Sequence, residues 1–436
     1  MREQCHPVAM ASDDEVGDGD DDDDGIFDEC ARGLEADGYA LLSLSALPSH
    51  GRRRPRGVCE GCVATDVARA FDTARRALDA VHRTGDHSQA IAAAGPSPPL
   101  IDPSTDSGGW TGYHPAASGH GRYNRNREGF VFSDGGTFDA AMTSGGADDG
   151  GTDGGGSGAS DDDFRAGMGR LFRAMHDDAA GGVLGAIERR LGLPRSYFRR
   201  ELGPTETSSQ WHVKRYVVDD AVQDRDASHP NPEDDAAIGE RDDRRGGDDV
   251  ASAPGGGKSR REAAEMLLPV HTDPSLISVI VHDRAGTNAG GMGLEVFHPD
   301  PAGGGAGGSW REISRHGHEI AVIFVGSVLS HLTGGRIYSA ARHRVVNRDT
   351  SSHSSYIREA DGVGAERMAA TLFVRPNGDA VMRRLPSRHL QCNDGAMIEK
   401  KEKNPMTFRA WNARVAKNYV KRKPKQVSTG TSNDFG

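Results

Sequence analysis

The chain has 436 residues, of which 35% are hydrophobic and 58 are glycine, and its formal net charge is −11 at pH 7. Two or three domains would fit this length, but the composition indicates that much of the chain buries no apolar surface. The acidic balance argues against nonspecific nucleic-acid binding. No run of about 20 apolar residues and no signal-peptide core is present, so we expect a protein without a membrane span or secretion signal.

Three stretches lack apolar periodicity and are predicted to be solvated loops: 13–24, 144–163 and 219–261. The remaining chain is enough for one folded core with flanking helices and a C-terminal extension. We therefore expect seven segments, namely an acidic disordered N-terminus, a helix and strand region that covers the core, a Gly/Asp-rich linker, a helix with the first core strand, a disordered insertion, the core domain, and a C-terminal helix with a basic tail. Their ranges are 1–24, 25–140, 141–163, 164–218, 219–262, 263–385 and 386–436.

The five cysteines are too few and too scattered to form a disulfide framework in a chain of this length. This indicates a reducing compartment, and we expect a cytoplasmic protein. Cys59 and Cys62 have the spacing of half a zinc site, but no second pair completes it. We interpret them as ordinary thiols.

The first predicted elements are a short helix over 27–37 and an apolar strand over 38–42. A second helix is predicted over 66–82, with Asp66 as its N-cap and one apolar stripe, formed by Val67, Phe71, Ala74, Leu78 and Val81. A third helix is predicted from 164 to about 191 and ends at Gly192, with Pro194 close behind. Both apolar stripes are expected to pack against the core.

Two segments between these helices and the core are polar but patterned. Residues 122–132 concentrate three arginines and three aromatic residues in a chain that is only 6% aromatic. Residues 210–216 alternate like a strand, with Lys214 and Tyr216 on the same face. Lys214 faces either a carboxylate or the solvent, and the pattern leaves both open.

The most informative motif is His271-Thr272-Asp273. A second histidine, His343, follows 70 residues after Asp273 in the segment Ala-Arg-His-Arg-Val-Val. In a strand, side chains at i and i+2 share a face, so His271 and Asp273 can reach one ion. Two imidazoles and one carboxylate are the ligands of a non-haem ferrous site, with three open positions. His331 is a rival third ligand by its spacing from Asp273.

The text around this motif resembles the isopenicillin-N-synthase-like branch of the iron(II)/2-oxoglutarate dioxygenases over about residues 267–385. The family patterns are H-T-D, G-L-x-V, W-x-x-V, a buried strand that ends in G-D or G-E, L-T-N-G, H-R-V and R-x-S-x-x-F-F. Their counterparts here follow in the same order: His271 to Asp273, then 293–296, 310–313, 320–327, 332–335, 343–345 and 367–373, with Gly-Ser at the end of the buried strand. The resemblance implies a mainly β fold, a double-stranded β-helix (jelly-roll) core with flanking helices.

The resemblance also implies roles for single residues. His271, Asp273 and His343 would hold Fe(II), and Arg367 would bind the far carboxylate of the co-substrate 2-oxoglutarate. Tyr216 matches the second Tyr of the family's R-x-N-Y-Y-P strand, whose Asn and Tyr help hold the co-substrate, so Tyr216 would also bind 2-oxoglutarate. In this fold, segments such as 122–132 often cover the mouth of the barrel. They would either favour an anionic or amino-acid-like substrate or pair structurally with carboxylates.

The chain departs from the family pattern at three points. Ala369 replaces the serine of R-x-S, Lys214 replaces the Asn of the Tyr-bearing strand, and Arg367 lies unusually far beyond the last histidine, across a hydrophilic insertion. Arg348 and Arg358 are therefore rival anchors. A guanidinium alone can still hold a carboxylate through two charge-assisted hydrogen bonds.

The predicted function is that of an Fe(II)- and 2-oxoglutarate-dependent dioxygenase. It would hydroxylate a small-molecule substrate with dioxygen and release succinate and CO2. Nothing in the sequence names the substrate, or the oligomeric state, and desaturation or ring closure are alternative outcomes. Two rival functions are an iron/O2 oxidase that does not use 2-oxoglutarate and a catalytically silent metal-binding protein of the same fold.

Overall fold

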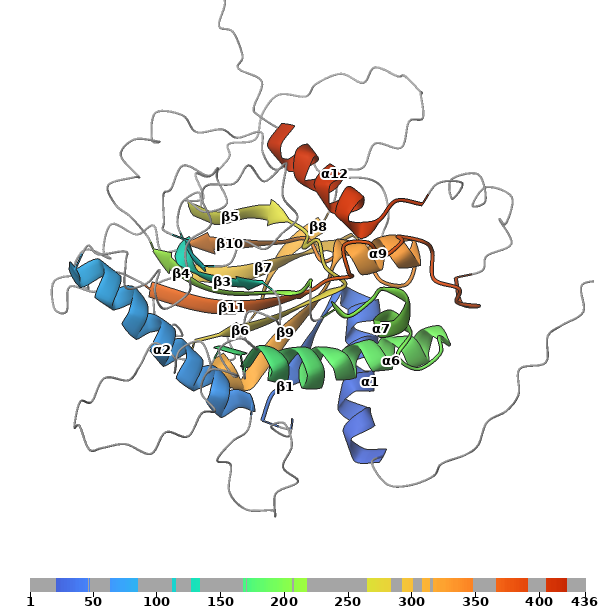
Figure 1. Cartoon of the computed structure of the whole chain (residues 1–436), viewed down its shortest axis with the longest axis horizontal. Coiled ribbons are helices and arrows are strands. Elements are labelled where there is room, and N and C mark those ends of the chain that lie inside the picture. Colours follow the sequence, from blue (N-terminus) through green and yellow to red (C-terminus); the bar gives the residue numbers. More distant parts are fainter. Residues whose placement is uncertain are drawn as a thin grey trace, which may run out of the picture.

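Two antiparallel β-sheets face each other at the centre of the protein, and helices cover one of them (Figure 1). The computed structural model describes residues 21–45, 47, 63–84, 112–114, 127–133, 168–169, 171–205, 208–217, 265–283, 292–300, 308–313, 317–347, 366–390 and 405–421. Within these ranges the architecture is mainly β with flanking helices, and the two facing sheets form the expected jelly-roll core. No helix in the described ranges is long and apolar enough to cross a membrane.

The larger sheet has seven strands in the order β1-β9-β6-β11-β4-β3-β2. Its strands are β1 (Tyr39–Ser43), β9 (Ile320–Val325), β6 (Ile277–His282), β11 (Glu366–Val374), β4 (Gln210–Val217), β3 (Arg127–Ser133) and β2 (Gly112–His114). The smaller sheet has the order β5-β10-β7-β8, with β5 (Glu265–His271), β10 (His343–Asn347), β7 (Met292–Pro299) and β8 (Gly308–Ile313).

The helices lie mainly on the outer face of the larger sheet. They are α1 (Asp21–Asp37), α2 (Val63–Thr84), the π-helix η1 (Ala174–Ala180), α6 (Gly181–Leu191) and α7 (Tyr197–Glu201). A short 3-10 helix η4 (Gly317–Glu319) precedes β9, and α9 (Ser327–Thr333) follows it. The C-terminal helix α12 (Phe408–Lys421) lies near α9.

The buried side chains form two separate cores because alternate residues of each strand point to opposite faces. The outer core joins α1, α2 and α6 to the larger sheet and includes Trp211, Val279 and Leu372. The inner core lies between the sheets and includes Tyr216, Phe324, Val345 and Ala369. Odd-numbered residues of β11 therefore face the space between the sheets, as do even-numbered residues of β4.

The structure agrees with most of the predicted elements and shifts some boundaries. The helix before β1 starts at Asp21 and so includes the last four residues of the acidic run. The second helix starts at Val63, so Asp66 lies in its first turn and the N-cap prediction is wrong. The third helix contains the π-helical segment Ala174–Ala180, which the apolar stripe did not predict.

The third helix ends where the sequence predicts. Gly192 adopts a left-handed conformation with φ 63°, and its N–H bonds back to the carbonyl of Arg189. Such a C-cap favours glycine because it has no Cβ. Residues 144–163 and 219–261, together with Cys59 and Cys62, lie outside the described residues.

Candidate metal centre

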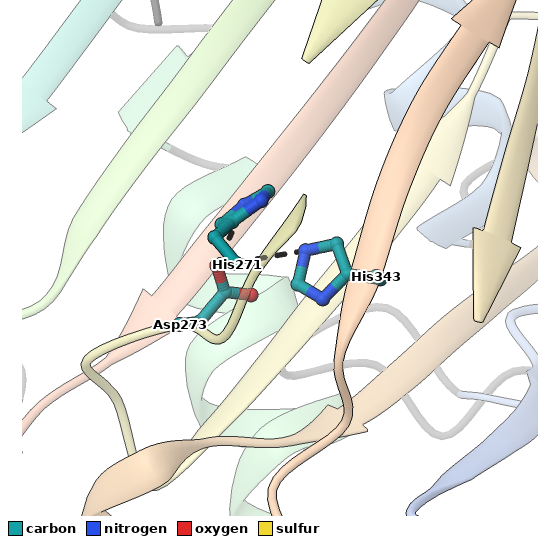
Figure 2. A group of neighbouring side chains, drawn as sticks. All are labelled: His271, Asp273 and His343. Carbon is teal, nitrogen blue, oxygen red and sulfur yellow. Dashed lines mark ion pairs between the residues drawn. The ribbon is translucent and has the colours of Figure 1, made fainter. Parts of the chain in front are cut away.

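The three predicted metal ligands meet between the two sheets (Figure 2). His271 is the last residue of β5 and is paired in register with His343, the first residue of β10. Asp273 follows β5 by two residues. Their ligand atoms all lie within 4.8 Å of one another, with Asp273 Oδ1 at 3.5 Å from His271 Nε2 and 3.7 Å from His343 Nε2. One ion can therefore contact all three side chains.

Backbone hydrogen bonds fix the orientation of both imidazoles. His271 Nδ1–H donates to the carbonyl of Pro269 at 2.7 Å, and His343 Nδ1–H donates to the carbonyl of Ala341 at 3.0 Å. With the proton on Nδ1, each Nε2 presents its lone pair toward Asp273. Metal-bound histidines are commonly held in this way.

The electrostatics of the centre favour neutral imidazole. Burial, followed by the positive charge of a protonated His343, lowers the pKa of His271 to about 3. A metal ligand must be deprotonated to bind, so this imidazole is ready to coordinate at neutral pH. Asp273 is 3% exposed, and its Oδ2 has no hydrogen-bond partner among the described residues. A buried carboxylate oxygen without a partner is costly unless a cation satisfies it, so the donor set fits Fe(II).

The loop that carries Asp273 is held by the first residue of α9. Ser327 donates from both its backbone N–H and its hydroxyl to the carbonyl of Asp273, at 2.8 and 2.9 Å. The preceding Gly326 lies so close that a Cβ there would be 1.9 Å from the carbonyl oxygen of Ser275. The glycine at the end of the buried strand β9 therefore positions a metal ligand.

Arg367 and Tyr216 lie side by side on the inner face of the larger sheet. They are opposite each other in the β11–β4 register, and the guanidinium carbon lies 5.3 Å from the centre of the Tyr216 ring. Arg367 is 3% exposed, and its Nη2 donates to His282 Nε2 at 2.6 Å. A buried guanidinium directed between the sheets is suited to bind a carboxylate.

The rival residues fall into two groups. His331 lies on α9, is exposed and faces Trp411 with a ring separation of 6.1 Å, so this rival does not join His271 and Asp273, whereas the preferred ligand His343 does. Arg348 and Arg358 lie outside the described residues. Lys214 is 5% exposed, which excludes the solvated orientation.

Further basic side chains lie near the centre, and two of them, His212 and Arg375, did not stand out in the sequence. His212 shares the inner face of β4 with Lys214, and Arg127 begins β3. Arg375 directly follows β11 and is close enough to Asp273 for that carboxylate to raise its pKa, although burial lowers it overall, to about 10. The sequence offered two signals: the two-residue spacing of Lys214 from Tyr216, and the arginine-rich segment 122–132, which contains Arg127.

The comparisons with known proteins agree with this geometry. Residues 227–376 match the family model described as the 2OG-Fe(II) oxygenase superfamily, a range that contains all three candidate ligands and Arg367. No curated protein matches the chain.

Solved structures of similar fold cover almost the whole chain. A full-length Neurospora crassa protein, solved in complex with alpha-KG and thymine, has 14% identity and a TM-score of 0.51, over 91% of this chain and 92% of that chain. The complex of the same protein with alpha-KG and 5-formyluracil has 13% identity and a TM-score of 0.50, over 90% and 89%. The dioxygenase for auxin oxidation of rice has 17% identity and a TM-score of 0.47, over 93% and 92%.

At these identities the solved structures show the fold alone, and the family model supplies the class of chemistry. The fold, the matched region and the buried His-Asp-His group agree with one another. The chain therefore carries a domain of the 2OG-Fe(II) oxygenase superfamily, enzymes that use iron(II) as cofactor and 2-oxoglutarate as co-substrate.

Proposed function

We propose that the protein hydroxylates a small organic molecule while 2-oxoglutarate is converted to succinate and CO2. The observation that carries the proposal is the buried group of His271, Asp273 and His343, in which both Nε2 atoms face the carboxylate. Bound iron(II), with 2-oxoglutarate and dioxygen, supplies the oxidising chemistry. The described side chains bind, orient and exclude water.

Arg367 is the proposed anchor for the distal carboxylate of 2-oxoglutarate. Its guanidinium is held by His282 and the Tyr216 ring on the inner face, so it is oriented before the co-substrate arrives. Ala369, the next inner position of β11, offers no hydroxyl. The anchor would therefore rely on the guanidinium, which can donate two parallel hydrogen bonds to one carboxylate.

The assignment to the isopenicillin-N-synthase-like branch is also a proposal, supported by the ordered motifs from His271 to Phe373. The small number of cysteines supports a reducing, cytoplasmic location. The substrate of this chain does not follow from the Neurospora crassa protein, which was solved with thymine and with 5-formyluracil. A sequence identity of 14% supports a shared fold but does not support a shared substrate pocket.

An anaerobic titration with ferrous iron tests the proposal. With 2-oxoglutarate present, chelation of the iron by its keto and carboxylate oxygens should give a weak charge-transfer band in visible light. The band should be absent without 2-oxoglutarate and absent in Asp273→Ala. Iron binding without a band would favour an iron/O2 oxidase that uses no 2-oxoglutarate. No iron binding would favour a catalytically silent protein of the same fold.

A further inference from the structure

Four basic side chains gather on the inner face of the larger sheet, beside the metal centre. They are Arg127 on β3, His212 and Lys214 on β4, and Arg375 directly after β11, and we call them the inner cationic cluster. His212 and Lys214 alternate with outward residues of β4 and so face the same side as Tyr216, which belongs to the core between the sheets. Arg127 lies opposite Tyr216 in the β3–β4 register.

The members of the cluster act on one another electrostatically. Burial, followed by Lys214, Arg375 and Arg127, lowers the pKa of His212 well below its ordinary value, so His212 is a neutral imidazole at pH 7 and can contribute a hydrogen bond but no charge. Burial and Arg127 likewise lower the pKa of Lys214. Two members of the cluster lie close enough to the metal centre for charge–charge interactions with it. Arg127 interacts with His271, and Arg375 interacts with Asp273.

The nearby acidic residue is already engaged on the other face of β3. Glu128 raises the pKa of Lys214, but its carboxylate accepts hydrogen bonds from Arg215 Nε at 2.7 Å and from the Tyr113 hydroxyl at 3.1 Å. Lys214 makes no ion pair with any residue of the described ranges. Buried charge of one sign is costly unless an opposite charge compensates it.

Lys214 lies between two small residues of the sheet. Its register partners on the two adjacent strands are Gly129 and Ala369, which have the smallest side chains. Gly129 has φ +144°, and a Cβ there would lie 2.0 Å from the Val213 carbonyl oxygen, so the close approach of β3 to β4 requires glycine. Lys214 therefore has no large side chain directly opposite it on either adjacent strand.

We propose that the inner cationic cluster binds the carboxylate, or an equivalent oxyanion, of the molecule that is oxidised, which makes the substrate an organic acid. The inference rests on the proposed function and names the substrate class of that site. Two charged groups interact electrostatically with Lys214. They are Arg127 and Glu128, and both belong to β3. Arg367 lies instead between Tyr216 on β4 and His282 on β6, so 2-oxoglutarate would be held on the β11 side of Tyr216, and Lys214 and Arg127 would hold the substrate carboxylate from the β3 side.

Matched acids and amides test the proposal in the full chain loaded anaerobically with Fe(II) and 2-oxoglutarate. Acetate, hexanoate and benzoate are titrated against their amides, and binding is followed by the perturbation of the charge-transfer band. At least one acid should bind more tightly than its amide by about tenfold or more, as a charge-assisted hydrogen bond predicts. Lys214→Met should abolish this preference, and Arg76→Met, on the exposed side of α2, should retain it.

The outcomes separate the inference from the proposed function. A missing charge-transfer band in the unchanged protein overturns the proposed function. A normal band without preference for any acid, or tight binding of thymine in place of the acids, overturns only the inference. If Lys214→Met weakens 2-oxoglutarate binding as strongly as Arg367→Lys does, the carboxylate at the cluster is that of 2-oxoglutarate and the substrate assignment fails. A retained band in Lys214→Met shows that the variant has folded.

Discussion

Arg367→Lys and Arg367→Ala should both raise the Michaelis constant for 2-oxoglutarate, but by different amounts. Arginine can donate two parallel charge-assisted hydrogen bonds, each worth about 1.5–3 kcal/mol. Lysine keeps the charge but loses the fork, so we expect an increase of about tenfold to a hundredfold. Alanine leaves a buried carboxylate unpaired, which costs about 3–5 kcal/mol, or roughly two hundredfold to several thousandfold.

The surroundings of Arg367 define the assay and its controls. Its side chain also contacts His282 and Tyr216, so thermal melting must show that each variant is folded. Succinate formation is then measured against 2-oxoglutarate concentration, and ferrous binding without 2-oxoglutarate should not change. Ala369→Ser adds a hydroxyl at the next inner position of β11 and should improve 2-oxoglutarate affinity several-fold, because one hydrogen bond contributes about 0.5–1.5 kcal/mol. An unchanged 2-oxoglutarate dependence in Arg367→Ala, or its loss in Arg375→Ala instead, would refute the assignment.

Three further predictions concern the metal centre and its support. Alanine at His271, Asp273 or His343 should lower ferrous affinity more than about a hundredfold by titration, since losing even a hydrogen-bond partner of a ligand costs about 10–100-fold; full activity in any of them would remove that residue from the centre. Gly326→Ala should displace the Asp273 loop, lower stability by about 1–3 kcal/mol and weaken iron binding, and unchanged melting and iron affinity would contradict the close approach. Burial raises the pKa of Cys30 to about 12, so iodoacetamide at pH 8 should leave this thiol unmodified until the protein unfolds, as peptide mass spectrometry would show; rapid labelling would contradict its burial.

The candidate metal centre could be predicted from the sequence because its ligands lie in short, distinctive motifs. His271 and Asp273 sit two residues apart at the end of a strand, and the residues around His343 carry the same family pattern. The helical stripes were equally readable, since burial of one face gives a period of 3.6 residues. Cap positions were less so: Asp66 is a good N-cap residue, but the helix gains three more residues before it.

The inner cationic cluster could not be predicted because its burial depends on a distant part of the chain. A strand that carries His212 and Lys214 at alternate positions has the pattern of a half-exposed strand with its polar face in water. Here that face is covered by the smaller sheet, whose first strand begins at Glu265. Only the pairing of the two sheets distinguishes a buried cation from a solvated one.

The register of β4 with its neighbours gives a physical reason why the two proposed carboxylate sites would be separate. Tyr216 faces Arg367 across β11, whereas Lys214, one inner position along, faces the bare Ala369 on that side and Gly129 on the other. If Arg367 and Lys214 both contacted the same carboxylate, one bound anion would occupy both side chains. The co-substrate would then compete with the substrate. Because Arg367 is held toward His282 on β6 and Lys214 is influenced by β3, each site can bind its own acid. The order of the strands would thereby allow both acids to be present beside the iron at the same time.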